Sequence, residues 1–186
     1  MTVALRHPER WSAAEYLGFE ETASERHEYI DGIIYAMVGG TDAHNLVTGN
    51  LFALLHNHLP DRCQVFEQGM KLRVGMEATE RFFYPDVMVS CSDLDRAKLY
   101  RERPLLIAEV LSESTERADR ADKFDICKKI PELQEYIVIA QDVPQVEIFR
   151  RGNAWRVETY FLDDTITLQS VDLTLPVAQL YRRVKF

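Results

Sequence analysis

Residues 82–89 have the sequence FFYPDVMV, and residues 105–111 have the sequence LLIAEVL. Runs this apolar are typical of strands that are buried on both faces. Each run nevertheless contains one acid, Asp86 in the first and Glu109 in the second. A buried carboxylate without a partner costs roughly 3 kcal/mol or more, so we expect a positive charge between the two acids. Because side chains alternate between the two faces of a strand, the acids can converge if the two strands are neighbours.

Length and composition favour one ordinary globular domain over residues 1–186. Hydrophobic residues make up 46% of the chain and charged residues 28%, which indicates a folded protein and not a disordered one. The first eight residues lack the apolar core of a signal peptide, and no stretch is apolar enough to span a bilayer. We therefore expect a cytoplasmic protein.

The cysteines are Cys63, Cys91 and Cys127, an odd number at wide spacings. They form no Cys-x-x-Cys pair, so the sequence predicts neither a disulfide framework nor a thiolate zinc site. We expect reduced and partly buried thiols.

The net charge of −8 and the isoelectric point near 5.2 argue against a protein that coats nucleic acid by bulk electrostatic attraction. Local phosphate contacts remain open, because basic residues concentrate on either side of residues 105–111. They are Arg101, Arg103, Arg117, Arg120, Lys123, Lys128 and Lys129. Such a run marks either a phosphate-binding surface or a solvated face.

Local signals predict helices and strands in one continuous domain. Ser12 and Glu15 form a capping box that begins a helix, and Asp31-Gly32 is a tight-turn pair typical of a hairpin. The predicted helices cover about 12–21, 41–59 and 115–130, and the predicted strands cover about 27–30, 33–37, 64–66, 70–74, 82–90, 105–111, 135–140 and 145–150. This order predicts an α/β or α+β fold with helices packed on a mixed sheet.

Several motifs can be set aside. The sequence has no Walker loop, no Gly-x-Ser-x-Gly elbow and no Gly-x-Gly-x-x-Gly turn, which removes the simplest nucleotide-binding, hydrolase and dehydrogenase functions. His56 and His58 are two apart on a predicted helix, so they point in different directions and cannot chelate one metal from that helix. His44 follows a diglycine near a helix start, and we favour a capping or packing role over catalysis.

The remaining motifs resemble a known family. They are YPDV at 84–87, LIAEVLS at 106–112, DRADKF at 119–124 and LQEY at 133–136. Their order and spacing resemble the bacterial "putative restriction endonuclease" family, the Uma-type branch of the PD-(D/E)xK nuclease superfamily. The resemblance extends from EYL at 15–17 to LTLP at 173–176. It implies a single restriction-endonuclease-like α/β domain with a central mixed sheet flanked by helices.

The resemblance also implies a metal site. Asp86 and Glu109 take the positions of the superfamily's magnesium-binding acids, together with the main-chain carbonyl of Val110 and a scissile phosphate. Magnesium prefers such hard oxygen ligands, and manganese can substitute for it. Glu28 resembles the additional acid that many members place beside the metal. From the sequence alone, Glu28 can equally be an exposed acid on a hairpin.

One position departs from the superfamily motif. Lysine is expected two residues after Glu109, but this chain has Leu111 there. The resemblance places the catalytic basic residue at Lys123 in the following helix. The alternative is that Lys123 forms a surface ion pair with Asp119, four residues earlier. Cys127 stands where the family has tyrosine, and Glu113 where it commonly has proline. The surroundings of the site therefore differ from the family pattern, and the resemblance alone does not establish that this chain has kept the activity.

Gln68 and Lys71 belong to a segment that we expect beside the same site. On a regular strand they face opposite sides, so only one can point at the metal unless Gly69 introduces a bulge. We favour Lys71.

Three functional hypotheses follow. The leading one is a magnesium-dependent endonuclease that hydrolyses phosphodiester bonds in DNA, expected to be a homodimer because a double-strand cut needs two active sites or two encounters. The alternative is a catalytically inactive nuclease-fold protein that binds nucleic acid or a protein partner. The third is a structural role in a homo-oligomer, with the acids neutralised by Arg or Lys.

Overall fold

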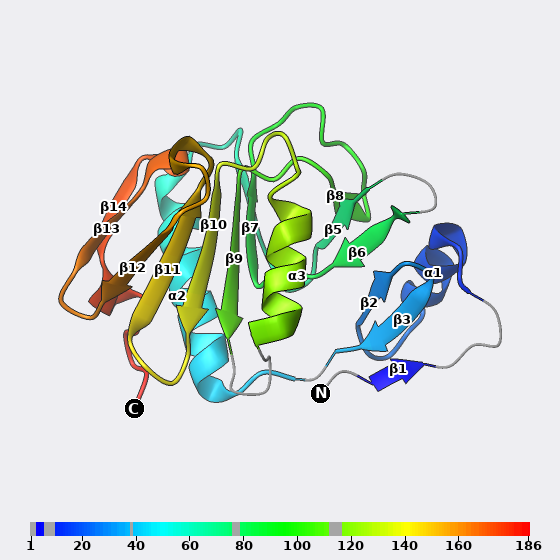
Figure 1. The fold of residues 1–186 in the computed structure, drawn as a ribbon, viewed down its shortest axis with the longest axis horizontal. Coiled ribbons are helices and arrows are strands. Elements are labelled where there is room, and N and C mark those ends of the chain that lie inside the picture. The colour runs from blue at the N-terminus through cyan, green and yellow to red at the C-terminus, as the bar shows by residue number, and fades with distance from the viewer. Residues whose placement is uncertain (1–2, 6–9, 38, 76–78, 112–116) are drawn as a thin grey trace.

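The computed structural model describes residues 3–5, 10–37, 39–75, 79–111 and 117–186, which form one α/β domain (Figure 1). The predicted helix over 115–130 is observed from Arg117, and the two residues before it lie outside the described ranges. The helices are α1 (Ala13–Glu20), α2 (Asp42–His58) and α3 (Arg117–Cys127), with short 3-10 helices at Arg151–Asn153, Gln169–Val171 and Val177–Gln179.

The described strands form two six-stranded sheets and a separate hairpin. The N-terminal sheet has the order β1-β3-β2-β6-β5-β8, made of β1 (Val3–Leu5), β3 (Ile33–Ala36), β2 (His27–Ile30), β6 (Arg81–Phe83), β5 (Lys71–Val74) and β8 (Tyr100–Arg101). The main sheet has the order β12-β11-β10-β9-β7-β4, made of β12 (Val157–Phe161), β11 (Gln145–Arg150), β10 (Glu135–Ala140), β9 (Leu106–Leu111), β7 (Val87–Ser90) and β4 (Gln64–Glu67). The hairpin is β13 (Thr165–Leu168) with β14 (Leu173–Pro176).

The main sheet is mixed, as predicted. β9 and β10 are parallel, and the other neighbours in this sheet are antiparallel. β7 pairs with β9, with Val87 opposite Ala108. β7, which begins directly after Asp86, and β9, which contains Glu109, are therefore direct neighbours. This is the condition for the two acids to converge.

The predicted single strand over residues 82–90 is wrong in one respect, because it is two strands in two different sheets. β6 ends at Phe83 in the N-terminal sheet, and β7 begins at Val87 in the main sheet. Pro85 lies between them and has no N–H to donate to a ladder, so the strand is interrupted there. Asp86 consequently lies in the link between the sheets and not in the middle of a strand.

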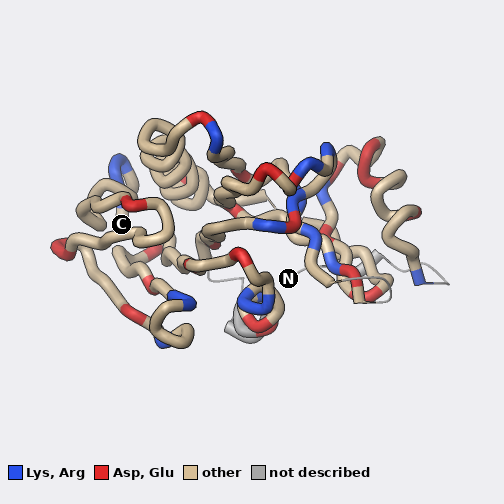
Figure 2. The backbone as a smooth tube through the Cα atoms, turned by 90° about the horizontal axis from the view of Figure 1, so that it is seen from above, with Lys and Arg blue, Asp and Glu red and all other residues tan. Residues whose placement is uncertain are grey.

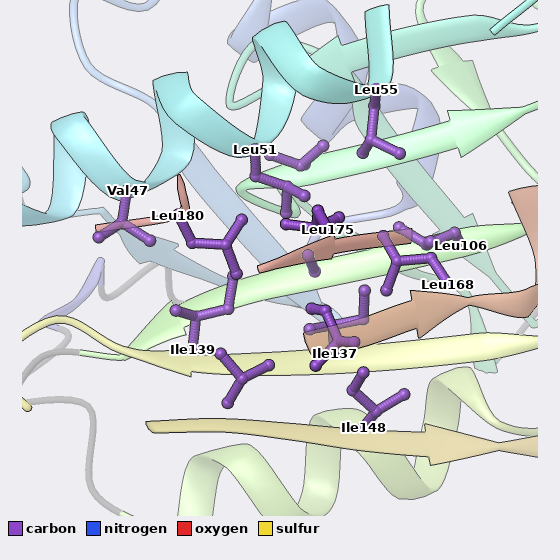
Figure 3. Close-up of a cluster of buried hydrophobic side chains, with 14 of the residues drawn as sticks. Val47, Leu51, Leu55, Leu106, Ile137, Ile139, Ile148, Leu168, Leu175 and Leu180 are labelled. Carbon is purple, nitrogen blue, oxygen red and sulfur yellow. The ribbon is translucent and has the colours of Figure 1, made fainter. Parts of the chain in front are cut away.

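Helices cover both faces of the central strands β7, β9 and β10 (Figure 1). On one face, Val47, Leu51 and Leu55 of α2 pack on Val87, Leu106 and Ala108, as Figure 3 shows for the labelled members of this cluster. On the other face, Met88 and Ile107 join a second cluster with Phe124 and Cys127 of α3. This alternation places Glu109, two residues after Ile107, on the α3 face.

The prediction of three reduced thiols is wrong for two of them. Cys63 and Cys91 form a disulfide, and Cys127 is free and buried. The pairing follows from strand register: Gln64 of β4 lies opposite Ser90 of β7, so the next residues outward face each other. Sequence spacing could not show this register. Disulfides are uncommon in cytoplasmic proteins, and the cytoplasmic location stays a prediction of the sequence alone.

Basic and acidic residues are interspersed along the backbone and do not separate into a basic half and an acidic half (Figure 2). No helix among the described residues has the length and apolar character needed to cross a membrane. Any attraction for an anionic partner must therefore come from a local arrangement of charges.

Candidate functional site

Asp86 is buried, with 8% of its surface exposed, and three groups surround its carboxylate. The main-chain N–H of Val110 donates a hydrogen bond of 2.7 Å to Oδ2. His44 Nε2 lies 3.2 Å from Oδ1, and the Gln68 amide Nε2 lies 3.5 Å from the same oxygen. Asp86 is thus hydrogen-bonded directly to Val110, the residue that follows Glu109 on β9.

Glu109 lies on β9, and its side chain is 13% exposed. The antiparallel register that pairs Val87 with Ala108 places Asp86 opposite Glu109 when it is extended by one residue. Burial raises the pKa of the Glu109 carboxyl to about 8; Lys123 opposes this rise, and the charges of Asp86 and Glu28 add to it. The predicted convergence of the two acids is therefore observed.

Lys123 of α3 points inward and is the positive charge beside the acids. Its Nζ lies 3.0 Å from Glu109 Oε1 and 3.1 Å from Glu28 Oε1. Burial opposes the charge of Lys123, but Glu109 and Glu28 outweigh it and raise the pKa of the ammonium above its usual value. The alternative partner, Asp119, has a side chain outside the described part of the structure.

Glu28 of β2 belongs to the same cluster and is not an exposed hairpin acid. Its side chain is 20% exposed, and Oε1 accepts a 3.4 Å hydrogen bond from the main-chain N–H of Tyr84 in addition to the contact with Lys123. Three elements from different parts of the chain, β2, β9 and α3, therefore meet at one ammonium group.

Cys127 follows Lys123 by one helical turn and is fully buried. Burial raises the pKa of this thiol to about 12, so it stays protonated near neutral pH. It packs in the apolar cluster under α3. The other departure from the family pattern, Glu113, lies outside the described residues.

His44 is a site residue that the sequence interpretation missed. It lies in the first turn of α2, where its main-chain N–H donates to the side chain of the N-cap residue Thr41. Burial lowers its pKa, but the hydrogen bond and charge of Asp86 outweigh burial and raise the pKa above its usual value. A Cβ at Gly40 would lie 2.8 Å from His44 Nδ1, so glycine permits this close approach. The diglycine before the helix was the signal that could have identified His44.

Gln68, and not the favoured Lys71, contacts the acid centre. The amide Nε2 of Gln68 lies 3.3 Å from His44 Nδ1 as well as near Asp86, and its main-chain N–H donates to the Asp86 carbonyl at 3.2 Å. Lys71 instead lies against the ring of Tyr84. Gln68 lies three residues before Lys71, where β5 begins. The prediction from strand alternation therefore failed, because Gln68 is not part of that strand.

The donor set is compatible with a magnesium ion. Glu109 Oε1 is buried, and the ammonium of Lys123 lies 3.0 Å from it. No group of three or more His, Cys, Asp or Glu side chains converges as a complete metal cage in the described ranges. Magnesium does not need such a cage, because it commonly uses one or two carboxylates, waters and substrate phosphate oxygens.

The raised pKa of Glu109 predicts how the stability of the metal-free protein depends on pH. The folded state keeps the Glu109 proton up to about pH 8, whereas the unfolded chain loses it near the ordinary value of 4.5. Between these values the folded state binds more protons, so this carboxyl lowers the free energy of unfolding as pH rises, by at most about 1.4 kcal/mol per unit. Glu109→Gln should lack this contribution.

Denaturant unfolding of both proteins in a chelating buffer measures the effect. The free energy of unfolding of Glu109→Gln should increase relative to wild type from about pH 5 to about pH 8 and then level off. A constant difference across this range would contradict the raised pKa.

Comparison with known proteins places the chain in a family. Residues 13–178 match Uma2, which is described as "Putative restriction endonuclease". The chain belongs to the Uma2 family. Two Synechocystis relatives are similar: "Uncharacterized protein slr1290" is 34% identical over 94% of this chain and 93% of its own length, and "Uncharacterized protein sll1609" is 40% identical over 75% and 80%.

A solved structure supports the fold of this Uma2 protein. The crystal structure of "a putative nuclease belonging to DUF820" from Anabaena variabilis superposes with a TM-score of 0.76, covering 94% of this chain and 99% of that one. The sequence identity is 18%, so the likeness concerns the fold alone. The predicted family and the predicted nuclease-type α/β fold are both confirmed.

Proposed function

We propose that this Uma2 protein is a magnesium-dependent endonuclease that hydrolyses phosphodiester bonds in DNA. The observation that carries the proposal is the pairing of buried Asp86 with Glu109 on neighbouring strands, beside the ammonium of Lys123. The family supports a nuclease role. The proposed ligands are Asp86, Glu109, the Val110 carbonyl and, directly or through water, Glu28, with manganese able to replace magnesium.

The chain's own residues prepare this chemistry. The Val110 N–H, His44 and Gln68 fix the orientation of the Asp86 carboxylate. A magnesium ion held there would polarise the phosphodiester and lower the pKa of a water that attacks phosphorus. Lys123 has a raised pKa and stays protonated, so it acts as a fixed positive charge for the phosphate and not as a base.

A second function is favoured by a specific observation. Lys123 already pairs with both Glu109 and Glu28, and Leu111 replaces the motif lysine. These ion pairs can neutralise the acids without a metal, as in a nuclease-fold protein that binds nucleic acid or a partner without cutting. Metal affinity distinguishes the two functions: an endonuclease needs it, and a binding protein that has lost its site does not.

A homodimer is part of the leading proposal. The described chain provides a single acid centre, and cutting both DNA strands in one encounter requires two such centres. A twofold pair of protomers would supply them.

The proposal predicts metal-dependent cleavage. Purified wild-type protein should convert supercoiled plasmid into nicked and linear forms with magnesium or manganese, and should leave it intact with a chelator. Parallel assays with single-stranded DNA and RNA define the substrate. Intact substrates under all metal conditions, combined with the absence of manganese binding by calorimetry, would reject the endonuclease and select the non-cutting binding protein.

A further inference from the structure

Lys71, the first residue of β5, is a buried lysine without a carboxylate partner. Its surface is only 8% exposed, and its ammonium lies 5.3 Å from the centroid of the Tyr84 ring. Within the described residues it forms neither a hydrogen bond nor an ion pair. Burial lowers its pKa; the charges of Glu20 and Glu21 oppose this only in part, and the positive charge of Arg26 adds to it. Among the described residues, this buried cation therefore has no carboxylate in direct ion-pair contact.

Arg26 provides a second cation at the same ring. It is exposed, and its guanidinium carbon lies 5.9 Å from the Tyr84 centroid. A Cβ added to Gly69 would lie 3.7 Å from one of its terminal nitrogens. Gly69 follows Gln68, which contacts Asp86, so the two cations lie beside the segment that borders the acid centre.

Two of the neighbouring acids, Glu20 and Glu28, are bound to other groups. Glu20 accepts hydrogen bonds from the main-chain N–H of His27 at 2.9 Å and from the Tyr84 hydroxyl at 2.8 Å, and His27 Nδ1 lies 3.0 Å from it. Glu28 pairs with Lys123. Within the described residues, neither carboxylate forms an ion pair with Lys71 or Arg26, so the two cations add positive charge beside the Gln68–Gly69 segment.

Other basic residues of the chain differ in this respect. Arg103 pairs with Glu132 at 2.7 Å, and Lys128 pairs with Asp125 at 2.5 Å. Each is neutralised by an exposed or half-exposed acid. A basic side chain without an acidic partner can bind an anion, because the anion then supplies the negative charge that the protein does not.

We propose that Lys71 and Arg26, on the ring of Tyr84, bind a backbone phosphate of the nucleic acid adjacent to the scissile one. Tyr84 precedes Asp86 by two residues, with only Pro85 between them, so this subsite is joined to the acid centre by a short stretch of chain. The nucleic-acid ligand rests on the proposed function. The contact itself is electrostatic and is independent of magnesium and of cleavage.

Binding without metal tests the subsite separately from catalysis. The probe is a fluorescently labelled duplex DNA of about 20 base pairs, followed by anisotropy in chelator from about 50 to about 200 mM salt. Lys71→Met keeps the apolar stem and removes the charge. It should weaken binding about tenfold and reduce the slope of log affinity against log salt by about 1. Lys71→Arg should retain most of the affinity.

Lys185→Met, at an exposed lysine near the C-terminus, is the matched control and should leave affinity and slope unchanged. Arg26→Ala is a second test at an exposed position that need not affect folding. If wild type binds DNA and neither Lys71→Met nor Arg26→Ala changes the affinity or the slope, the subsite is rejected. Absence of DNA binding by wild type also rejects it. Weakened binding by these variants, together with no cleavage by wild type, supports the subsite and rejects the endonuclease.

Discussion

Asp86→Asn and Glu109→Gln are each expected to reduce the rate of metal-dependent DNA cleavage on the order of a thousand-fold or more. Each substitution removes one negative charge from the proposed magnesium ligands, and loss of about 4 kcal/mol of transition-state stabilisation corresponds to this factor. The shape of the side chain is kept. An asparagine at position 86 can still accept the Val110 N–H, so the fold should persist.

Two measurements on the same variants separate catalysis from folding. Calorimetry should show that manganese binds wild type and not Asp86→Asn, and thermal unfolding should show that manganese raises the melting temperature of wild type alone. Glu132→Gln is the control, because Glu132 pairs with Arg103 away from the acid centre. Cleavage by Asp86→Asn at the wild-type rate would show that the acid pair is not the catalytic centre.

Strand periodicity explains why the central pair was predictable. Asp86 and Glu109 each interrupt an apolar run, and alternation places Met88 and Ile107 in the same cluster under α3. The family resemblance added Lys123, and the structure directs its ammonium to Glu109 and Glu28. The acid pair was therefore predictable from the sequence directly before β7 and within β9, whereas the position of Lys123 was predictable only from the resemblance.

Contacts that depend on packing between distant segments were not predictable. His44 and Gln68 are 24 residues apart, and they meet at Asp86 because α2 packs beside β4 and β7. The Cys63–Cys91 disulfide depends on the register of β4 and β7. The break at Pro85 was visible in the sequence, but its consequence, a change of sheet, required knowledge of both partners. Neither propensity nor spacing contains this information.

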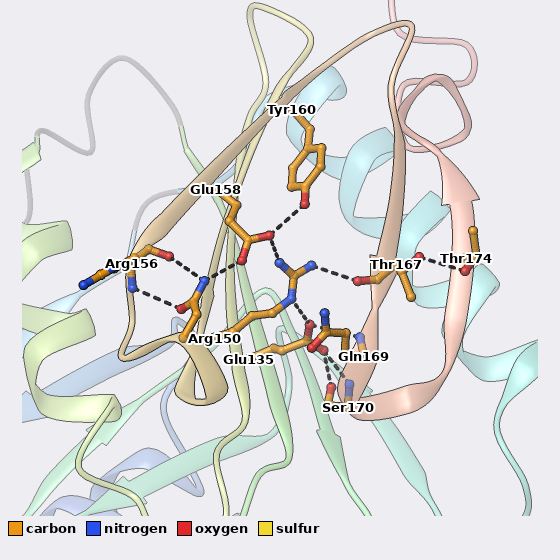
Figure 4. A network of polar contacts seen from close by, with 10 residues as sticks. Glu135, Arg150, Arg156, Glu158, Tyr160, Thr167, Gln169, Ser170 and Thr174 are labelled. Atoms are coloured by element: carbon orange, nitrogen blue, oxygen red, sulfur yellow. Dashed lines mark hydrogen bonds and ion pairs between the residues drawn. The ribbon is translucent and has the colours of Figure 1, made fainter.

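A buried polar network joins strands β10, β11 and β12 of the main sheet to the β13–β14 hairpin (Figure 4). Arg150 of β11 donates to Glu135 Oε1 of β10 at 2.9 Å and to the Thr167 carbonyl of β13 at 2.8 Å, and it also pairs with Glu158 of β12. Glu135, 1% exposed, also accepts hydrogen bonds from the main-chain N–H and hydroxyl of Ser170. One guanidinium therefore connects three strands of the sheet with the hairpin.

Arg150→Ala is expected to lower the free energy of unfolding by about 3 to 5 kcal/mol, because it leaves the buried Glu135 carboxylate without its cation. For a chain of this length, that loss corresponds to a decrease in melting temperature of roughly 6 to 20 °C. Denaturant unfolding and calorimetry measure both quantities. Arg156→Ala removes an exposed guanidinium from the adjacent turn and should change stability by less than about 0.5 kcal/mol.

The double variant Glu135→Gln/Arg150→Met tests the physical reason for this loss. It removes both buried charges, and the glutamine can still accept hydrogen bonds from Ser170. If the cost of Arg150→Ala arises from an uncompensated carboxylate, the double variant should be more stable than Arg150→Met alone, since no buried charge remains at position 135. Equal stability of the two would mean that the lost hydrogen bonds and packing of Arg150, and not the charge of Glu135, account for the destabilisation.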